Sequence, residues 1–172
     1  MYSETQSNFL SADECKTLIS LPKHWHKSVV VGAGVGTGYS SQRVSESCQV
    51  RYSDELGSIL LPKLKQFNIT SLPAVVNYAR YEAGGIFKPH KDRMPGVDSI
   101  KDRLVTAVIQ LNEGYEGGSL VIKGQQVEKG LGTIALFDSG ITHNVTRITQ
   151  GIRYSLTIWF TKDNLKPIMN VL

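Results

Sequence analysis

The second half of the chain is built from short runs of strand-forming residues that glycines interrupt at close spacing. From Leu72 onward these runs are AVVNYARY, GIFKPH, RLVTAVIQLN, GSLVI, GQQVEK, GTIALFD, HNVTRIT and GIRYSLTIWF. Many short strands with turn signals between them are typical of a β-sandwich or a β-barrel. The pattern therefore predicts a mainly β core over residues 73–162.

Within these runs, polar and apolar residues alternate with the period of a strand. Side chains two apart on a strand point to the same face. One face of the last run carries Arg153, Ser155, Thr157 and Trp159, and the other carries Tyr154, Leu156 and Ile158. The run LVTAVIQLN alternates in the same way. We expect the apolar face to pack against helices and the mixed face to line a hollow that suits a small polar ligand.

The helix signals lie in the first half of the chain. Ser11 to Glu14 read as a capping box, and a second helix is expected after Ser53, with Pro62 bending or ending it. The glycine-rich segment 32–47 lacks the spacing of a dinucleotide-binding loop and is expected to be a mobile loop. The length of 172 residues fits one domain, with 1–72 as a helical and loop support for the β core. The fold class is thus mainly β with N-terminal helices, an α+β arrangement.

Charge and hydropathy narrow the choice of partners only a little. The net charge is +4, but the basic residues are scattered and form no block that would indicate nucleic-acid binding. No apolar run is long enough to span a membrane, and the N-terminus lacks the features of a signal peptide. These observations predict a cytoplasmic protein with no membrane partner. No pattern predicts the oligomeric state.

Three residues form a candidate metal site. His90 and Asp92 are two apart in KPHKD, so on an extended segment both face one side, and His143 opens a later predicted strand. Two imidazoles and one carboxylate are the ligand set of non-haem iron(II) oxygenases, which keep the remaining positions open for O2 and a cosubstrate. The HxD triplet alone favours a solvated turn, so the prediction depends on His143 joining it.

Arg153, ten residues after His143, is the candidate anion receptor. A guanidinium inside a barrel is costly unless an anion meets it, whereas an outward-pointing arginine at a strand start costs nothing. Both readings are open from the residues alone. If Arg153 points inward, a dicarboxylate that chelates the metal at one end and meets Arg153 at the other fits 2-oxoglutarate.

These residues belong to a longer pattern. It runs Tyr81-x-x-Gly84-x-x-Phe87-x-x-His90-x-Asp92, then Arg103-Leu-Val-Thr106 with Leu111-Asn112, Gly117-Gly118-x-Leu120, Phe137, His143 and Gly151-x-Arg153-Tyr-Ser-Leu-Thr157-Ile-Trp159-Phe. The pattern, which covers about half of the chain, resembles the iron(II)/2-oxoglutarate-dependent dioxygenases, in particular their prolyl 4-hydroxylase-like branch.

The resemblance implies a double-stranded β-helix, or jelly-roll, and a role for each matching residue. His90, Asp92 and His143 would hold Fe(II), and Arg153 would bind the distal carboxylate of 2-oxoglutarate. The other positions that the resemblance places around the cosubstrate are Tyr81, Thr106, Leu120 and Val145, with Trp159 near the mouth. Gln110 stands where some relatives carry a tyrosine that meets the distal carboxylate, and its amide can also donate a hydrogen bond.

The implied reaction is hydroxylation of a C–H bond with O2, releasing succinate and CO2, with ascorbate as the reductant. A prolyl residue of a peptide or protein is the substrate that the resemblance favours, with Arg43 and Arg103 as candidate substrate contacts. A free amino acid, another small molecule or an alkylated nucleic acid are alternatives within the same chemistry, although no basic aromatic cluster supports nucleic acid. A jelly-roll binding module without catalytic activity is the alternative of a different class.

Overall fold

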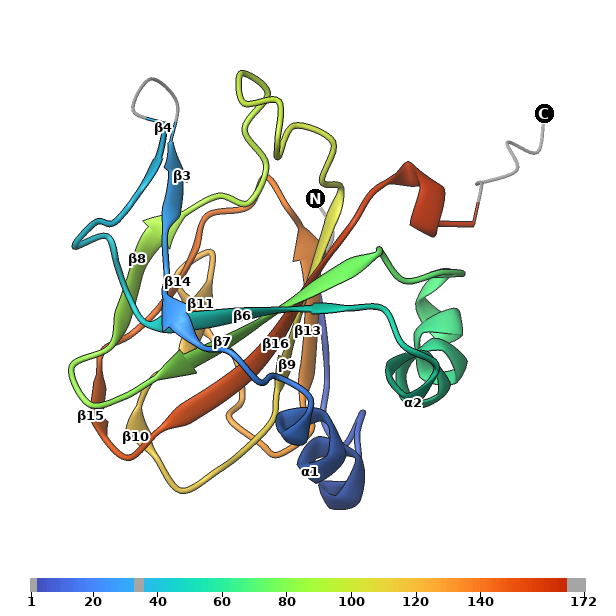
Figure 1. The fold of residues 1–172 in the computed structure, drawn as a ribbon, viewed down its shortest axis with the longest axis horizontal. Coiled ribbons are helices and arrows are strands. Elements are labelled where there is room, and N and C mark those ends of the chain that lie inside the picture. Colours follow the sequence, from blue (N-terminus) through green and yellow to red (C-terminus); the bar gives the residue numbers. More distant parts are fainter. Residues whose placement is uncertain (1–2, 33–35, 167–172) are drawn as a thin grey trace.

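Two antiparallel sheets form the core of the computed structural model, which describes residues 3–32 and 36–166 (Figure 1). The larger sheet has the order β1 (Ser3–Gln6), β13 (Ile134–Asp138), β9 (Val105–Gln110), β16 (Arg153–Phe160), β7 (Val75–Tyr81), β6 (Glu46–Arg51) and β2 (His26–Lys27). The smaller has the order β12 (Gln125–Gln126), β11 (Leu120–Ile122), β14 (His143–Val145), β8 (Ile86–His90) and β5 (Arg43–Val44). The predicted mainly β jelly-roll fold is confirmed.

Both helices begin where the sequence predicts. The Ser11 hydroxyl accepts from the Glu14 amide, and the Glu14 carboxylate accepts from the Ser11 amide, which completes the capping box of α1 (Ala12–Ser20). Ser53 caps α2 (Asp54–Leu64). Pro62 lies inside α2, which continues for two more residues and then into a 3-10 turn, Lys65–Phe67. A second 3-10 turn spans Lys162–Asn164.

The apolar face of the larger sheet packs against these helices. Leu156 and Ile158 of β16 are fully buried, in one cluster with Leu18 of α1 and Leu56 of α2. The opposite face is turned toward the smaller sheet, where a second apolar cluster joins Val108 and Phe137 to residues of β11 and β14. The two faces therefore divide as the alternation predicts, and the space between the sheets is where the polar residues of β16 lie.

The run HNVTRIT, expected as one strand, contains two strands in different sheets. Strand β14 belongs to the smaller sheet, and β15 (Ile148–Gln150) pairs with β10 (Glu116–Gly117). The chain turns between them, where the Thr146 amide donates to the Ser119 carbonyl and the Ser119 amide donates to the Thr146 hydroxyl. The first bond continues the register of β14 with β11, but in the second the Thr146 hydroxyl takes the place of its carbonyl, and the strand pairing stops there. Strand propensity alone gives no sign of this change.

The glycine-rich segment 32–47 contains more secondary structure than a plain loop. Strands β3 (Val30–Gly32) and β4 (Gly36–Gly38) form a hairpin, although residues 33–35 lie outside the described part. Strand β5 then pairs with β8, so that Arg43 lies opposite Phe87. Movement of the segment stays a prediction. Within the described ranges, no helix has the length and apolar character needed to cross a membrane.

Candidate metal centre

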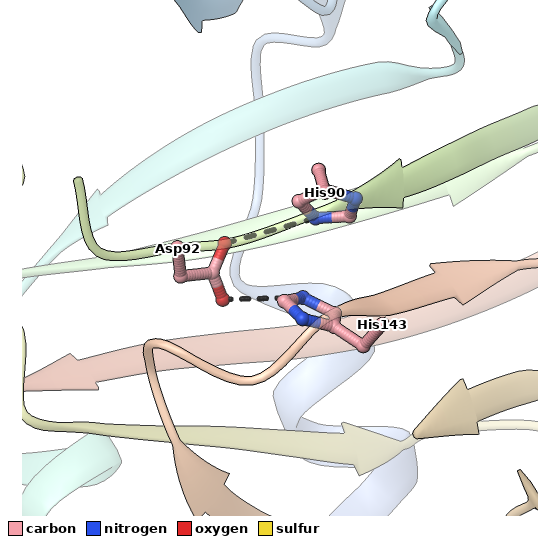
Figure 2. A group of neighbouring side chains, drawn as sticks. All are labelled: His90, Asp92 and His143. Carbon is pink, nitrogen blue, oxygen red and sulfur yellow. Dashed lines mark ion pairs between the residues drawn. The ribbon is translucent and has the colours of Figure 1, made fainter. Parts of the chain in front are cut away.

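The three candidate metal ligands meet between the sheets, as Figure 2 shows. His90 ends β8 and His143 begins β14, and the two residues are directly paired across the strands. Asp92 follows β8, with its carboxylate oxygens 3.7 Å from His90 Nε2 and 3.3 Å from His143 Nε2. The three ligand atoms lie within 4.8 Å of one another, so one cation can contact all of them. Strand pairing thus brings together residues that are more than fifty positions apart.

Both imidazoles are oriented by the same kind of local hydrogen bond, from Nδ1 to a backbone carbonyl oxygen. His90 Nδ1 lies 2.8 Å from the Lys88 carbonyl oxygen, and His143 Nδ1 lies 3.0 Å from the Ile141 carbonyl oxygen, each two residues earlier. A carbonyl oxygen only accepts, so Nδ1 carries the proton and donates. In the neutral rings, the lone pair is then on Nε2, which faces Asp92 and the common point. This is the tautomer that a metal ligand needs.

A chain of hydroxyl groups holds the Asp92 carboxylate in place. The Thr106 hydroxyl lies 2.9 Å from Asp92 Oδ2 and 2.9 Å from the Ser139 hydroxyl. The amide groups of Asp92 and Arg93 both donate to the Ser139 carbonyl oxygen at 2.9 Å. Thr106 and Ser139 are completely buried. The carboxylate therefore has little rotational freedom, which favours a site that is formed before the cation arrives.

The electrostatics of the three ligands favour a cation. Burial and the neighbouring His143 lower the pKa of His90 to about 4, so its Nε2 is unprotonated at neutral pH. Burial alone would raise the pKa of Asp92, but the hydrogen bond and charge of His143 outweigh it and hold that pKa well below its usual value. Burial would also lower the pKa of His143, yet the Asp92 carboxylate raises it. A proton shared by His143 and Asp92 is what a metal ion would displace.

Arg153 points into the protein, which decides between its two readings. The residue is 1% exposed, at the start of β16 and directly opposite Tyr81 of β7. Its Nη1 donates to the Ser155 hydroxyl at 3.1 Å, while Nε and Nη2 have no partner. A buried guanidinium with unpaired donors is costly unless an anion completes it. This orphaned pair of donors fits a ligand carboxylate.

One cavity connects the metal ligands to Arg153. Its walls come from both sheets, and its lining residues are Arg43, Asn77, Tyr81, Phe87, His90, Asp92, Val108, Leu120, His143, Val145, Arg153, Ser155, Thr157 and Trp159. The Arg153 guanidinium lies 5.4 Å from the centre of the Tyr81 ring. The ligand set suits iron(II), and the guanidinium suits a carboxylate at the other end. The two ends of the cavity therefore differ in chemistry: one suits a metal ion and the other an organic anion.

Three of the predicted site residues lie outside this lining. Thr106, expected on a pocket-lining position, instead supports Asp92 from behind. Gln110 is buried on β9, opposite Ser155. Arg103 lies over the Trp159 ring at 3.7 Å, and its Nη1 donates to the Asp92 carbonyl at 3.4 Å. Arg43 and Trp159 do line the cavity, at its side toward β5 and the C-terminal end of β16.

Two contributors were not predicted as site residues. Phe87 stacks on the His90 ring, with centres 3.5 Å apart and planes 12° from parallel, and Arg43 lies 4.8 Å from the Phe87 ring centre. Phe87 is three residues before His90 on β8, a spacing that on a regular strand places two side chains on opposite faces, and the register of β8 against β14 shifts in this stretch. Ser139 lies in a turn and carries no sequence signal for its role.

Known proteins share both the sequence pattern and the fold. The profile of the 2OG-Fe(II) oxygenase superfamily matches residues 76–161, which is half of the chain. A PKHD-type hydroxylase from Burkholderia ambifaria is 31% identical over 134 residues, covering 69% of this chain and 58% of that protein. Another, from Alteromonas mediterranea, is 28% identical over 159 residues, covering 83% and 69%. The chain thus spans less than two thirds of the Burkholderia relative.

The structural likeness extends further along the chain than the sequence likeness. The crystal structure of a Pseudomonas putida prolyl-4-hydroxylase matches with a TM-score of 0.65 and 22% identity, over 92% of this chain and 91% of that one. At this level of identity the likeness shows the fold. The jelly-roll frame and the supporting N-terminal segment are therefore shared.

Proposed function

This chain belongs to the 2OG-Fe(II) oxygenase superfamily, and on that premise we propose that it is an iron(II)- and 2-oxoglutarate-dependent dioxygenase. It hydroxylates a C–H bond and releases succinate and CO2. The observation that carries the proposal is one cavity that joins a His-Asp-His cluster to a buried, half-unpaired arginine. A metal site alone would fit many reactions, but a metal site together with a buried arginine in one cavity fits a chelating dicarboxylate.

The two ends of the cavity have separate tasks. His90, Asp92 and His143 hold the iron, which, with O2 and 2-oxoglutarate, supplies the oxidation of the C–H bond. Arg153 binds the distal carboxylate of 2-oxoglutarate, and Ser155 fixes the guanidinium by accepting from Nη1. Tyr81 lies against the same guanidinium and limits where the cosubstrate can sit.

The rest of the lining keeps water away from the reacting groups. Val108, Leu120 and Val145 are at most 6% exposed and present only hydrocarbon to the cavity. Phe87 covers one face of the His90 ring. A dry, fixed environment restricts the oxidant to the bound substrate. Ascorbate is the reductant we expect to sustain repeated turnover.

A prolyl residue of a peptide or protein is the substrate we propose. The hydroxylase names of the relatives and the prolyl-4-hydroxylase structure support this choice. Arg43 and Trp159 at the cavity, together with Arg103 stacked on Trp159, offer a cationic and aromatic surface for an extended chain. Trp25, the aromatic residue beside the basic segment near the N-terminus, instead packs against Tyr154 at 5.9 Å, which gives an alkylated nucleic acid no stacking platform there.

The test measures succinate released from 2-oxoglutarate, with iron(II) and ascorbate, in three parallel reactions. One contains a proline-rich peptide, one the same peptide with alanine in place of proline, and one a methylated oligonucleotide. We expect release to rise only with the proline peptide, together with a peptide mass gain of one oxygen atom. A rise with the oligonucleotide alone would replace the proposed substrate. No release and no iron uptake would leave a binding module.

A further inference from the structure

The cavity is lined by an uncharged amide that the proposed reaction leaves without a partner. Asn77 of β7 is 7% exposed and lines the cavity. Thr157 of β16 lies directly opposite and lines it too. Within residues 3–32 and 36–166, neither side chain has a hydrogen-bond partner. Because buried polar side chains are nearly always hydrogen-bonded, an unpaired amide at a cavity wall indicates a ligand.

Asn77 belongs to a row of polar side chains that leads from the cavity to the surface. Gln49 of β6 lies directly opposite Asn77 on its other side and is exposed. Paired residues share a face, and neighbouring strands are about 4.8 Å apart, so this polar row of Thr157, Asn77 and Gln49 spans roughly 10 Å. Val75, two residues before Asn77 and therefore on the same face, is 39% exposed. The cavity face of the larger sheet is thus open to solvent beside Asn77.

The polar row is separate from the end of the cavity that Arg153 forms. Arg153 lies opposite Tyr81, which is four residues after Asn77 on β7. Thr157 is likewise four residues after Arg153 on β16. Four residues of strand cover about 13 Å. The polar row therefore lies toward the end of β16 that carries Trp159, away from the proposed site of the cosubstrate's distal carboxylate.

The chemistry of the polar row fits a peptide main chain. A carboxamide offers both donors and an acceptor, and a hydroxyl also donates and accepts. The three side chains carry no charge, so the row supplies no counterion for a phosphate or carboxylate group. A peptide main chain is equally neutral and presents N–H and C=O groups along its length. In extended form it advances about 3.3 Å per residue, so about three residues cover the row.

We propose that Asn77 recognises the main chain of an extended peptide substrate inside the cavity. Its Nδ2 donates to the main-chain carbonyl oxygen of the prolyl residue that is hydroxylated. That carbonyl is the only main-chain hydrogen-bonding group that a proline offers, since its ring removes the N–H. Gln49 contacts the main chain of a residue nearer the surface. The inference rests on the proposed function, because it needs a peptide as the substrate.

The test measures peptide binding without turnover. The protein loaded with Mn(II) and 2-oxoglutarate is titrated by calorimetry, in the absence of O2, with a peptide of alternating proline and alanine. A second titration uses the same peptide with an ester in place of the amide after each proline, which makes the proline carbonyl a weaker acceptor. We expect the natural chain to bind the ester form about 3- to 10-fold more weakly, the loss of part of one hydrogen bond.

Asn77→Leu keeps the approximate size of the side chain but removes its polar atoms. It should bind the peptide about 3- to 30-fold more weakly than the natural chain and should no longer distinguish the peptide from its ester form. Its dissociation constant for 2-oxoglutarate should stay the same, which also shows that the variant is folded and holds the metal. An equal loss of 2-oxoglutarate affinity would assign Asn77 to the cosubstrate or to the fold and would overturn the inference.

Two exposed glutamines provide a graded effect and its control. Gln49→Leu, at the surface end of the polar row, should weaken peptide binding by about two- to threefold because water competes for an exposed hydrogen bond. Gln126→Leu, on the exposed edge strand β12 of the smaller sheet, is the matched control and should leave peptide binding unchanged. Equal effects of both changes would mean that the polar row is not the path of the peptide.

The outcome for the natural chain separates the two levels of the proposal. If it binds 2-oxoglutarate but not the peptide, and binds a methylated oligonucleotide instead, the proposed substrate is wrong and the inference is wrong with it. If it binds the peptide and Asn77→Leu binds it equally well, the proposed function stands and the Asn77 inference is wrong. Peptide binding that Asn77→Leu weakens, with 2-oxoglutarate binding unchanged, supports both.

Discussion

The two faces of the larger sheet are made from alternate residues of the same strands, yet they differ in how their side chains find partners. The apolar face packs against the helices, whereas the polar face contains a buried arginine with unpaired donors. On β16, Leu156 and Ile158 are fully buried against apolar neighbours, so that face is complete within the folded chain. On the other face, Arg153 is buried to the same degree, but two of its nitrogens have no partner. The apolar packing of the helix face stabilises the fold, whereas the cavity face keeps polar groups that the described residues leave unpaired. The strand period of two separates these tasks along one segment.

The largest effect is expected from removing a ligand on the cavity side. Asp92→Asn takes away the negative charge that the cation needs, so succinate release should fall to the level of the metal-free protein. For the natural chain, metal at a hundred times its dissociation constant stabilises the fold by about 2.7 kcal/mol. We therefore expect added Mn(II) to raise its melting temperature by about 5 to 10 °C, and that of the variant not at all.

A matched control for that change is available on the surface. Asp98 forms an ion pair with Lys101 on an exposed turn, and its side chain is 95% exposed. Asp98→Asn should keep both the activity and the Mn(II)-induced rise in melting temperature. A rise that survives in Asp92→Asn would show that the cation binds elsewhere.

The complementary change lies on the helix face. Leu156→Ala leaves a void among residues that are fully buried, and such truncations cost about 2 to 5 kcal/mol of unfolding free energy. Because Leu156 points away from the cavity, Mn(II) affinity and turnover of the folded fraction should stay the same. Denaturant titration and metal titration of the same sample measure both. A parallel loss of metal affinity would mean that the two faces are coupled rather than separate.

The sequence predicted what depends on local periodicity and failed where long-range contacts decide. Alternation in RYSLTIWF assigned the two faces of β16, and the capping residues located both helices. The cluster of candidate metal ligands could be predicted because His90 and Asp92 are two apart and His143 opens a strand. These features are set by neighbouring residues, which is why a single sequence carries them.

The support of the metal centre could not be predicted in this way. Thr106 and Ser139 are 33 residues apart, and only the pairing of β9 with β13 brings them together behind Asp92. Thr106 is also a common strand residue, so its identity does not distinguish a pocket wall from a carboxylate support. The division of HNVTRIT into β14 and β15 likewise occurs where Thr146 exchanges hydrogen bonds with Ser119, which is distant in sequence.

Removing the Thr106 hydroxyl behind Asp92 should have a smaller effect on metal binding than removing the Asp92 charge. Thr106→Val keeps the shape of the side chain but removes the hydroxyl that lies 2.9 Å from Asp92. Loss of such a contact to a ligand usually lowers metal affinity by about 10- to 100-fold. Calorimetric titration with Mn(II) measures it, with Thr149→Val on the exposed side of β15 as the control. An unchanged affinity would show that Asp92 needs no support from the sheet.

The smallest expected effect is an increase in the unfolding free energy, opposite in sign to the effect of Leu156→Ala. It tests the difference between the helix face and the cavity face most directly. Arg153 is a buried charge whose only side-chain hydrogen bond goes to Ser155. Replacing such a group by an apolar side chain of similar size is often stabilising, by about 1 kcal/mol or more. Arg153→Met should therefore unfold at higher denaturant concentration than the natural chain while losing its response to 2-oxoglutarate. Arg51→Met, at an exposed position, should change the unfolding free energy by less than about 0.5 kcal/mol.

Both results for Arg153→Met, the higher stability and the lost response to 2-oxoglutarate, are expected together only if Arg153 binds a ligand. If Arg153 stabilised the fold, as Leu156 does, its replacement would lower the unfolding free energy. Adding 2-oxoglutarate would then leave the natural chain the more stable of the two proteins, as before. If it serves the ligand, the natural chain is the less stable protein alone and becomes the more stable one once 2-oxoglutarate and Mn(II) are present. The measurement is the unfolding free energy of the natural chain and of Arg153→Met at increasing ligand concentration. A reversal in their order shows that Arg153 contributes to ligand binding rather than to the stability of the fold.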